Sequence, residues 1–205
     1  MPKGSPERTA ARKEEIINAC EKLYQTMSFK DITLKEIGNE TSFSRPTIYN
    51  YYQTKEEIFL ALFEREYVRW NDELQTILQD NKKLTKTELA EKLASSLANR
   101  QQLLKLLAMN NYDMEENSRP ELLNSFKVAY GGSIKNVCSI LTKFCPKKSD
   151  QEIQNIIYIF FPFMFGIYPY TAVTDKQKKA MKDAKVDFVY RSVFEITNNC
   201  LLKLL

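Results

Sequence analysis

The sequence predicts an all-α protein of about nine helices. Apolar residues recur in steps of three and four along most of the chain, which is the period of an amphipathic helix. The 205 residues include only 5 Gly and 7 Pro, too few for a β-sandwich with its many turns. We find no stretch of alternating apolar and polar residues that would indicate a strand.

The composition is that of a folded globular chain, and it excludes several chemistries. A hydrophobic fraction of 43% supplies a core, while the net charge of +4 is too small to identify a partner. Histidine is absent, which excludes His-dependent catalytic triads and imidazole metal ligands. The four cysteines form no Cys-x-x-Cys pair and sit among apolar neighbours, so we expect buried free thiols. Free thiols fit a reducing, cytoplasmic location. We expect no metal and no cofactor. The cysteines are Cys20, Cys138, Cys145 and Cys200.

The first 55 residues predict three helices. The first runs from about Glu7 to Met27. Thr33 is a suitable N-cap for a short second helix through Glu40, because a threonine hydroxyl can accept the free backbone N–H groups of the first turn. Ser44 is the expected N-cap of a third helix that ends near Tyr52.

The remainder of the chain predicts longer helices. Thr54 caps the fourth helix, with Glu57 at the capping-box position. Two adjacent glycines interrupt one later helix and indicate a kink or a close backbone contact. In order, the later expectations are helices over 84–107 with a break near Asn99, a polar connection over Tyr112–Pro120, a helix over 123–144 containing Gly131-Gly132, an apolar helix from Ser149 to near Pro169 bent by Pro162, and a last helix from about Thr174 through Val186, Val189, Val193, Ile196 and Cys200.

The segment 33–55 carries the functional signal. Two short helices joined by a tight turn form a helix-turn-helix, whose second helix enters the DNA major groove. In that groove Arg45 can grip a guanine edge and Asn50 an adenine edge, while Tyr49 and Lys55 are expected at phosphate oxygens. The predicted DNA-contacting residues are Thr33, Lys35, Ser44, Arg45, Pro46, Thr47, Tyr49, Asn50, Tyr51 and Lys55.

Residues 8–65 resemble the TetR family of bacterial transcriptional regulators. The likeness rests on Thr33-x-x-x-Ile37, the run Ser44-Arg-Pro-Thr-Ile-Tyr49-x-Tyr-Tyr52, and Lys55-x-x-Ile58. Three departures stand out: Gly38 replaces the usual alanine, Thr41-Ser42-Phe43 replaces the usual Ala-Gly-Val turn, and Tyr52 replaces phenylalanine. Without the turn glycine, either Ser42 adopts a left-handed conformation or the turn has another shape.

The resemblance implies a DNA-binding domain over 1–55 and a ligand-binding and dimerisation domain over 56–205. It implies a homodimer that acts as a ligand-responsive repressor on a near-palindromic double-stranded operator, and an apolar or aromatic small-molecule effector that releases it. The surplus of aromatic residues in the second domain indicates a pocket. The expected pocket residues are Trp70, Phe126, Tyr130, Phe161, Met164, Phe165 and Tyr168.

The sequence disfavours three alternatives. An enzyme is disfavoured because the sequence has no P-loop, no Gly-x-Ser-x-Gly elbow and no dinucleotide-binding glycine motif. A helical adaptor that binds protein after losing DNA contact is opposed by the retained Arg45, Thr47, Tyr49 and Lys55. The 22 residues between Glu152 and Asp175 carry no charge, but the prolines and glycine within them favour a buried helix over a membrane span.

Overall fold

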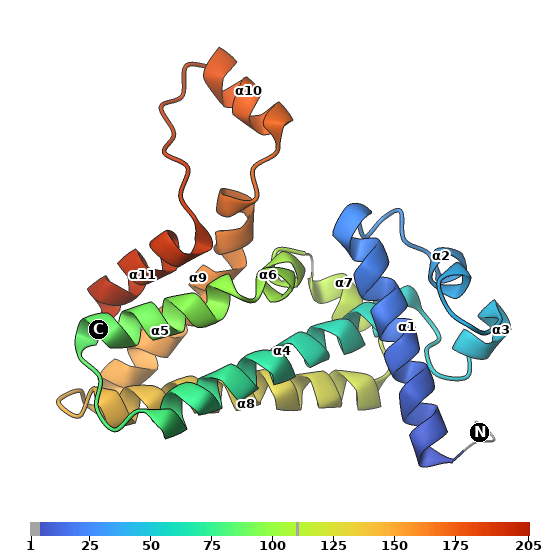
Figure 1. Cartoon of the computed structure of the whole chain (residues 1–205), viewed down its shortest axis with the longest axis horizontal. Helices are drawn as coiled ribbons and strands as arrows, with labels where there is room; N and C mark the ends of the chain where they lie inside the picture. Colours follow the sequence, from blue (N-terminus) through green and yellow to red (C-terminus); the bar gives the residue numbers. More distant parts are fainter. Residues whose placement is uncertain (1–4, 110) are drawn as a thin grey trace. The chain divides into compact units, whose positions relative to one another are not determined.

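The computed structural model describes residues 5–109 and 111–205, and within them it contains eleven α-helices and no strand (Figure 1). The predicted all-α class is therefore confirmed, but the predicted number of nine helices was too low. The helices are α1 (Pro6–Thr26), α2 (Leu34–Asn39), α3 (Arg45–Ile48), α4 (Lys55–Asp80), α5 (Lys86–Ala98), α6 (Gln101–Leu107), α7 (Asn111–Glu116), α8 (Pro120–Phe144), α9 (Asp150–Thr171), α10 (Asp175–Asp183) and α11 (Val193–Leu204).

The chain divides into two compact units. The first unit comprises Met1–Arg65 and Asn110–Val128, and the second comprises Glu66–Met109 and Ala129–Leu205. Helices α4 and α8 each contribute residues to both units. The functional boundary expected at residue 55 remains a prediction.

Hydroxyl caps form at most helix starts. The predicted caps Thr33 and Thr54 each accept a backbone N–H of the following turn. Thr85, Ser149 and Thr174 do the same at α5, α9 and α10. Ser44 is different, because its hydroxyl makes no cap bond and lies 3.3 Å from Thr47 Oγ1. Helix α3 is also shorter than predicted, since the chain leaves it after Ile48 through turns closed by the N–H groups of Asn50 and Tyr51.

Helix α7 replaces the polar connection predicted over Tyr112–Pro120. Within this segment Met114 is buried, and Ser118 Oγ donates a 2.6 Å hydrogen bond to the Met114 carbonyl. A helix of six residues with one buried apolar side chain offers no periodic pattern, which is why the sequence did not indicate it.

The predicted last helix is in fact two helices. Helix α10 ends at Asp183, and Lys185 adopts a left-handed φ of 54°, which ends the helical course. A capping box formed by Ser192 and Glu195 starts α11. Val186 and Val189 lie exposed between the two helices, so they are not part of an apolar stripe. The arm formed by residues 172–192 extends away from α5, α9 and α11 (Figure 1).

Each unit has its own aromatic core. In the first unit Phe59 is fully buried, with Tyr24 and Phe29 edge-on to its ring at 5.1 and 4.7 Å. In the second unit Trp70 and Phe161 pack with ring centroids 6.0 Å apart. Such offset aromatic contacts add to the free energy of burial.

The cysteines and the apolar segment follow the predictions in part. All four cysteines are free, but only Cys20 is buried and the other three are half-buried. Burial raises the pKa of the Cys20 thiol above its usual range. Among the described helices none is long and apolar enough by itself to cross a bilayer, and only α9 and α10 together, across an 82° bend, reach that length and composition.

Candidate nucleic-acid interface and ligand cavity

Helices α2 and α3 pack closely around two isoleucines and one glycine. Ile37 and Ile48 are fully buried. A Cβ at Gly38 would lie 3.3 Å from the Cβ of Arg45, tighter than an ordinary contact. The glycine that replaces the usual alanine therefore allows α3 to approach α2.

The turn between α2 and α3 has no left-handed serine. Among the described non-glycine residues, only Lys185 has a positive φ, so Ser42 is not the left-handed residue that the lost turn glycine had suggested. Instead Thr41 Oγ1 donates 3.0 Å hydrogen bonds to the Gly38 and Phe43 carbonyls, and the Ser42 N–H donates to Glu15 of α1. Hydrogen bonding from Ser42 lowers the pKa of Glu15. Hydrogen bonds that involve the side chains of Thr41 and Glu15 thus stabilise this turn without a glycine.

An exposed polar face follows the turn. Arg45 Nη2 donates a 3.1 Å hydrogen bond to the hydroxyl of Tyr49, whose side chain is 46% exposed. Asn50 is exposed beside them, and Thr47 is half-buried. Thr33, Lys35, Ser44 and Pro46 are also exposed. The face therefore presents hydrogen-bonding groups of the kind that contact base edges and phosphates.

Two predicted DNA-contacting residues are placed differently. Tyr51 is buried, with 9% of its surface exposed, so its ring does not belong to this face. Lys55 Nζ donates a 2.8 Å hydrogen bond to the Phe29 carbonyl and lies 4.2 Å from the centre of the Phe29 ring. A phosphate contact by Lys55 stays a prediction and would have to share this ammonium.

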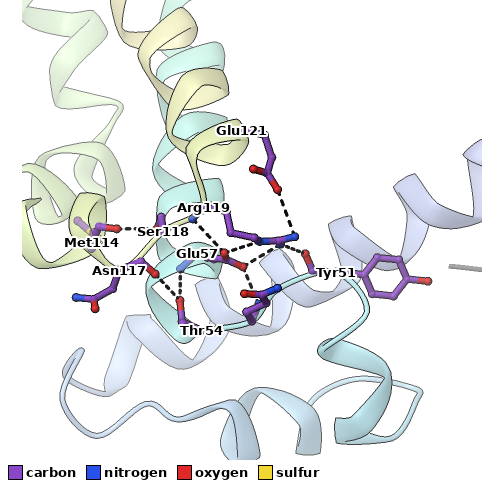
Figure 2. A network of polar contacts seen from close by, with 9 residues as sticks. Tyr51, Thr54, Glu57, Met114, Asn117, Ser118, Arg119 and Glu121 are labelled. Carbon is purple, nitrogen blue, oxygen red and sulfur yellow. Dashed lines mark hydrogen bonds and ion pairs between the residues drawn. The ribbon is translucent and has the colours of Figure 1, made fainter. Parts of the chain in front are cut away.

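Residues 45–52, which comprise α3 and the turns after it, are called the reading segment here. A buried ion pair close to the end of this segment was missed by sequence reasoning. Arg119 Nε lies 2.7 Å from Glu57 Oε1, and Glu57 is 1% exposed (Figure 2). Burial alone would raise the pKa of Glu57, but hydrogen bonds from Arg119 and from the N–H of Gln53, together with the charge of Arg119, lower it. The sequence had offered Glu57 only as a capping residue, and nothing local indicated a partner 62 positions away.

A cavity of about 400 Å³ lies between α8 and α9 in the second unit. The side chains that line it include no ionised group. Tyr130 and Phe161 meet in its wall with ring centroids 5.9 Å apart, edge to face. The lining consists of Tyr130, Ile134, Cys138, Gln154, Ile157, Tyr158, Phe161 and Pro162.

Only two of the predicted pocket residues, Tyr130 and Phe161, line this cavity. Trp70 and Met164 are fully buried core residues. Phe126 belongs to the first unit, where its ring packs 4.9 Å from that of Phe63. Phe165 is exposed and Tyr168 is half-buried on α9. Aromatic content alone could not separate cavity wall from solid core.

The compact two-helix module and its exposed polar face define a helix-turn-helix DNA-binding protein. Residues 16–62 match the model described as bacterial regulatory proteins, tetR family, and residues 64–192 match the tetracyclin repressor-like C-terminal domain. The chain therefore belongs to the TetR family, whose members are DNA-binding transcriptional regulators and not enzymes.

One curated sequence relative matches about a third of the chain. The chain is 32% identical over 63 residues to YfiR of Bacillus subtilis (strain 168), an uncharacterized HTH-type transcriptional regulator. The matched stretch spans 31% of this chain and 31% of YfiR.

Solved structures share the fold over nearly the whole chain. FadR from Bacillus subtilis, in complex with stearoyl-CoA, has a TM-score of 0.61 at 18% identity, covering 93% of this chain and 96% of its own. A putative TetR-family regulator from Mesorhizobium loti has a TM-score of 0.63 at 15% identity, covering 96% of each chain. Thermus thermophilus FadR, in complex with lauroyl-CoA, has a TM-score of 0.51 at 19% identity, covering 88% of this chain and 97% of its own.

Proposed function

We propose that the protein is a ligand-responsive repressor that binds a near-palindromic operator as a homodimer. A small apolar or aromatic effector in the cavity between α8 and α9 releases it from DNA. The observation that carries this proposal is that one helix, α8, both lines an uncharged cavity and begins inside the unit that holds the helix-turn-helix.

The exposed face that begins at Arg45 recognises the DNA sequence in this proposal. A guanidinium can donate two parallel bonds to a guanine edge, and the Asn50 amide can pair with an adenine edge. The Tyr49 hydroxyl already holds Arg45 in place, which reduces the side-chain entropy lost when DNA binds. Lys35 on α2 adds a phosphate contact that is independent of sequence.

The effector should be uncharged where it enters the cavity. A volume of about 400 Å³ lies in the range of small-molecule sites, and an unpaired ionised group would be costly against an apolar wall. The two FadR structures were determined with acyl-CoA molecules. For this chain we therefore test fatty acyl chains together with neutral aromatic compounds.

Dimerisation falls to the outer face of α9. Its exposed apolar residues outside the cavity lining include Ile159, Phe165 and Tyr170. Helix α11 instead buries Val193 and Leu201 against its own protomer, where it packs on α5 and α9. The proposed dimer seam therefore centres on α9. A two-fold dimer would place its half-sites about one helical turn, ~34–36 Å, apart or a multiple of that.

The test begins with operator selection from a random duplex library, followed by fluorescence-anisotropy titration. Arg45→Ala should lose about 1–3 kcal/mol at one base pair per half-site and relax specificity there. Arg191→Ala, which removes an exposed arginine of the arm, is the matched control and should bind as the wild type does. A wild-type protein that binds no duplex at low salt would support the adaptor alternative instead.

The effector is tested on the same complex. Stearoyl-CoA, lauroyl-CoA and a set of neutral aromatic compounds are added to the operator-bound protein. Release of the operator by a compound that the variant Ile134→Trp no longer responds to would place the effector in the cavity between α8 and α9. Binding without any change in operator affinity would contradict the proposed response.

A further inference from the structure

The guanidinium of Arg119 bridges two segments of the first unit. Its Nε donates to Glu57 Oε1 at 2.7 Å and its Nη2 to Glu57 Oε2 at 3.0 Å, while Nη2 also donates to the Tyr51 carbonyl at 2.8 Å (Figure 2). The backbone N–H of Arg119 adds a fourth bond, 3.2 Å long, to Glu57 Oε1. One side chain therefore holds both the first turn of α4 and the end of the reading segment.

Glu57 completes this arrangement from the other side. Its Oε2 accepts the N–H of Gln53 at 2.6 Å, so the carboxylate holds the residue that links Tyr51 and Tyr52 to α4. A further hydrogen bond joins the start of α4 to the segment before α8: Thr54 Oγ1 donates to the Asn117 carbonyl at 3.1 Å (Figure 2). The path of residues 51–54 is thus determined by contacts with residues 117–119.

The reading segment contains too little regular secondary structure to determine its own orientation. Helix α3 has only four residues, and the turns after it are closed by the N–H groups of Asn50, Tyr51 and Tyr52. So short a helix is marginal by itself and depends on tertiary contacts. The bond from Arg119 to the Tyr51 carbonyl is such a contact, and it lies one residue beyond Asn50.

We propose that Arg119 is a positioning residue for DNA reading, which through Glu57 and the Tyr51 carbonyl sets the orientation of the segment that carries Arg45, Tyr49 and Asn50. This inference rests on the proposed function for its consequence in DNA binding. The role requires an arginine, because a planar fork can bond a carboxylate with two nitrogens and a carbonyl at the same time. A lysine ammonium is a compact charge that cannot span both acceptors.

The experiment compares Arg119→Lys with Arg65→Lys in the full-length protein. Arg65 is the matched control because it lies in the same unit and its hydrogen bonds, 2.5–2.8 Å long, go to Glu14, Asn18 and Glu21 of α1 and not to residues 51–54. Both variants keep the charge, so both are expected to fold. Glu57→Gln is a third variant that removes the charge of the acceptor from the other side.

Two readouts are measured. Hydrogen exchange without DNA should show the amides of Tyr51, Tyr52 and Gln53 exchanging about tenfold faster in Arg119→Lys and Glu57→Gln, but unchanged in Arg65→Lys. The ratio of affinities for the selected operator and for random duplex should fall about tenfold in the first two variants, a loss of ~1.4 kcal/mol, and stay constant in Arg65→Lys. Loss of overall stability alone would lower both affinities together and leave their ratio intact.

Unchanged exchange at residues 51–53 in Arg119→Lys, or equal acceleration in Arg65→Lys, would overturn the proposal. Faster exchange with an unaltered operator-to-random ratio would overturn it as well, since the segment would then move without affecting reading. If the wild type binds no duplex, the proposed function fails by itself. The exchange experiment contains no DNA and still decides whether Arg119 positions the segment.

Discussion

The indole Nε1 of Trp70 donates a 3.0 Å hydrogen bond to Oγ of Ser96, and both side chains are buried in the second unit. The serine hydroxyl in turn donates to the Leu93 carbonyl at 2.8 Å. The only tryptophan of the chain is therefore held by a polar contact inside an apolar core. A buried N–H group needs such an acceptor because leaving it unpaired is costly.

Ser96→Ala should destabilise the protein by about 1–3 kcal/mol, because it leaves the Trp70 N–H buried without an acceptor. Urea unfolding followed by Trp70 emission measures the change. The neighbouring Ser95→Ala has the same helix-propensity effect at an exposed position of α5 and is the control. In a Trp70→Phe background the cost of Ser96→Ala should shrink. An equal cost in both backgrounds would show that the hydrogen bond contributes nothing.

The two adjacent glycines of α8 should respond differently to alanine. Gly131→Ala should stabilise the protein by roughly 0.5–1 kcal/mol, since its new methyl meets no atom within 4 Å and alanine favours the helix. At Gly132 the new Cβ would lie 3.1 Å from Asn71 Nδ2. Asn71 cannot move freely because it bonds the Ala129 carbonyl and Asn136. Gly132→Ala should therefore give a lower melting temperature than Gly131→Ala, and the reverse order would contradict this placement of Asn71.

The Glu57–Arg119 pair predicts a specific pH dependence. Because the pKa of Glu57 is lowered on folding from its ordinary value of 4.5, its contribution to stability is fully present above about pH 4.5. That contribution is lost as the pH falls through the lower, folded value. The free energy of unfolding of wild type minus that of Glu57→Gln should be positive at pH 7 and shrink on acidification below pH 4.5. A difference that stays constant from pH 7 to pH 3 would mean that the carboxylate charge is not stabilising.

Ile159→Glu should shift the protein from dimer to monomer in sedimentation velocity, because it places a charge on the outer face of α9. Val128→Glu introduces the same charge at an exposed valine in the first unit and should leave the dimer intact. A wild type that is already a monomer at micromolar concentration would contradict the dimer itself.

Local signals in the sequence were sufficient for much of the fold. The hydroxyl caps at Thr33 and Thr54 form as the residue order predicts, and the break near Asn99 falls at the end of α5. Capping depends on neighbours within four residues, so it can be read directly from the chain. The exposed face around Arg45 and Asn50 was predicted in the same way.

Features that depend on distant contacts were beyond the sequence. Tyr51 has the polar tip of a DNA-contacting residue, but tertiary packing buries it. Lys55 follows the family spacing, yet its ammonium bonds a carbonyl 26 positions earlier. Any aromatic residue of the second unit is of a type suited to a pocket wall. Only the packing shows that Tyr130 lines the cavity while Trp70 lies in the core.

The division of the first unit into two stretches of chain determines when that unit can be finished on the ribosome. A nascent chain that ends at residue 65 already contains every residue predicted to touch DNA, yet Glu57 has no guanidinium to pair with. Residues 66–109 must be synthesised before Arg119 emerges. Vectorial synthesis therefore delays completion of the reading unit until much of the second unit has been made, and a fragment ending at residue 65 would lack the partner of its buried carboxylate.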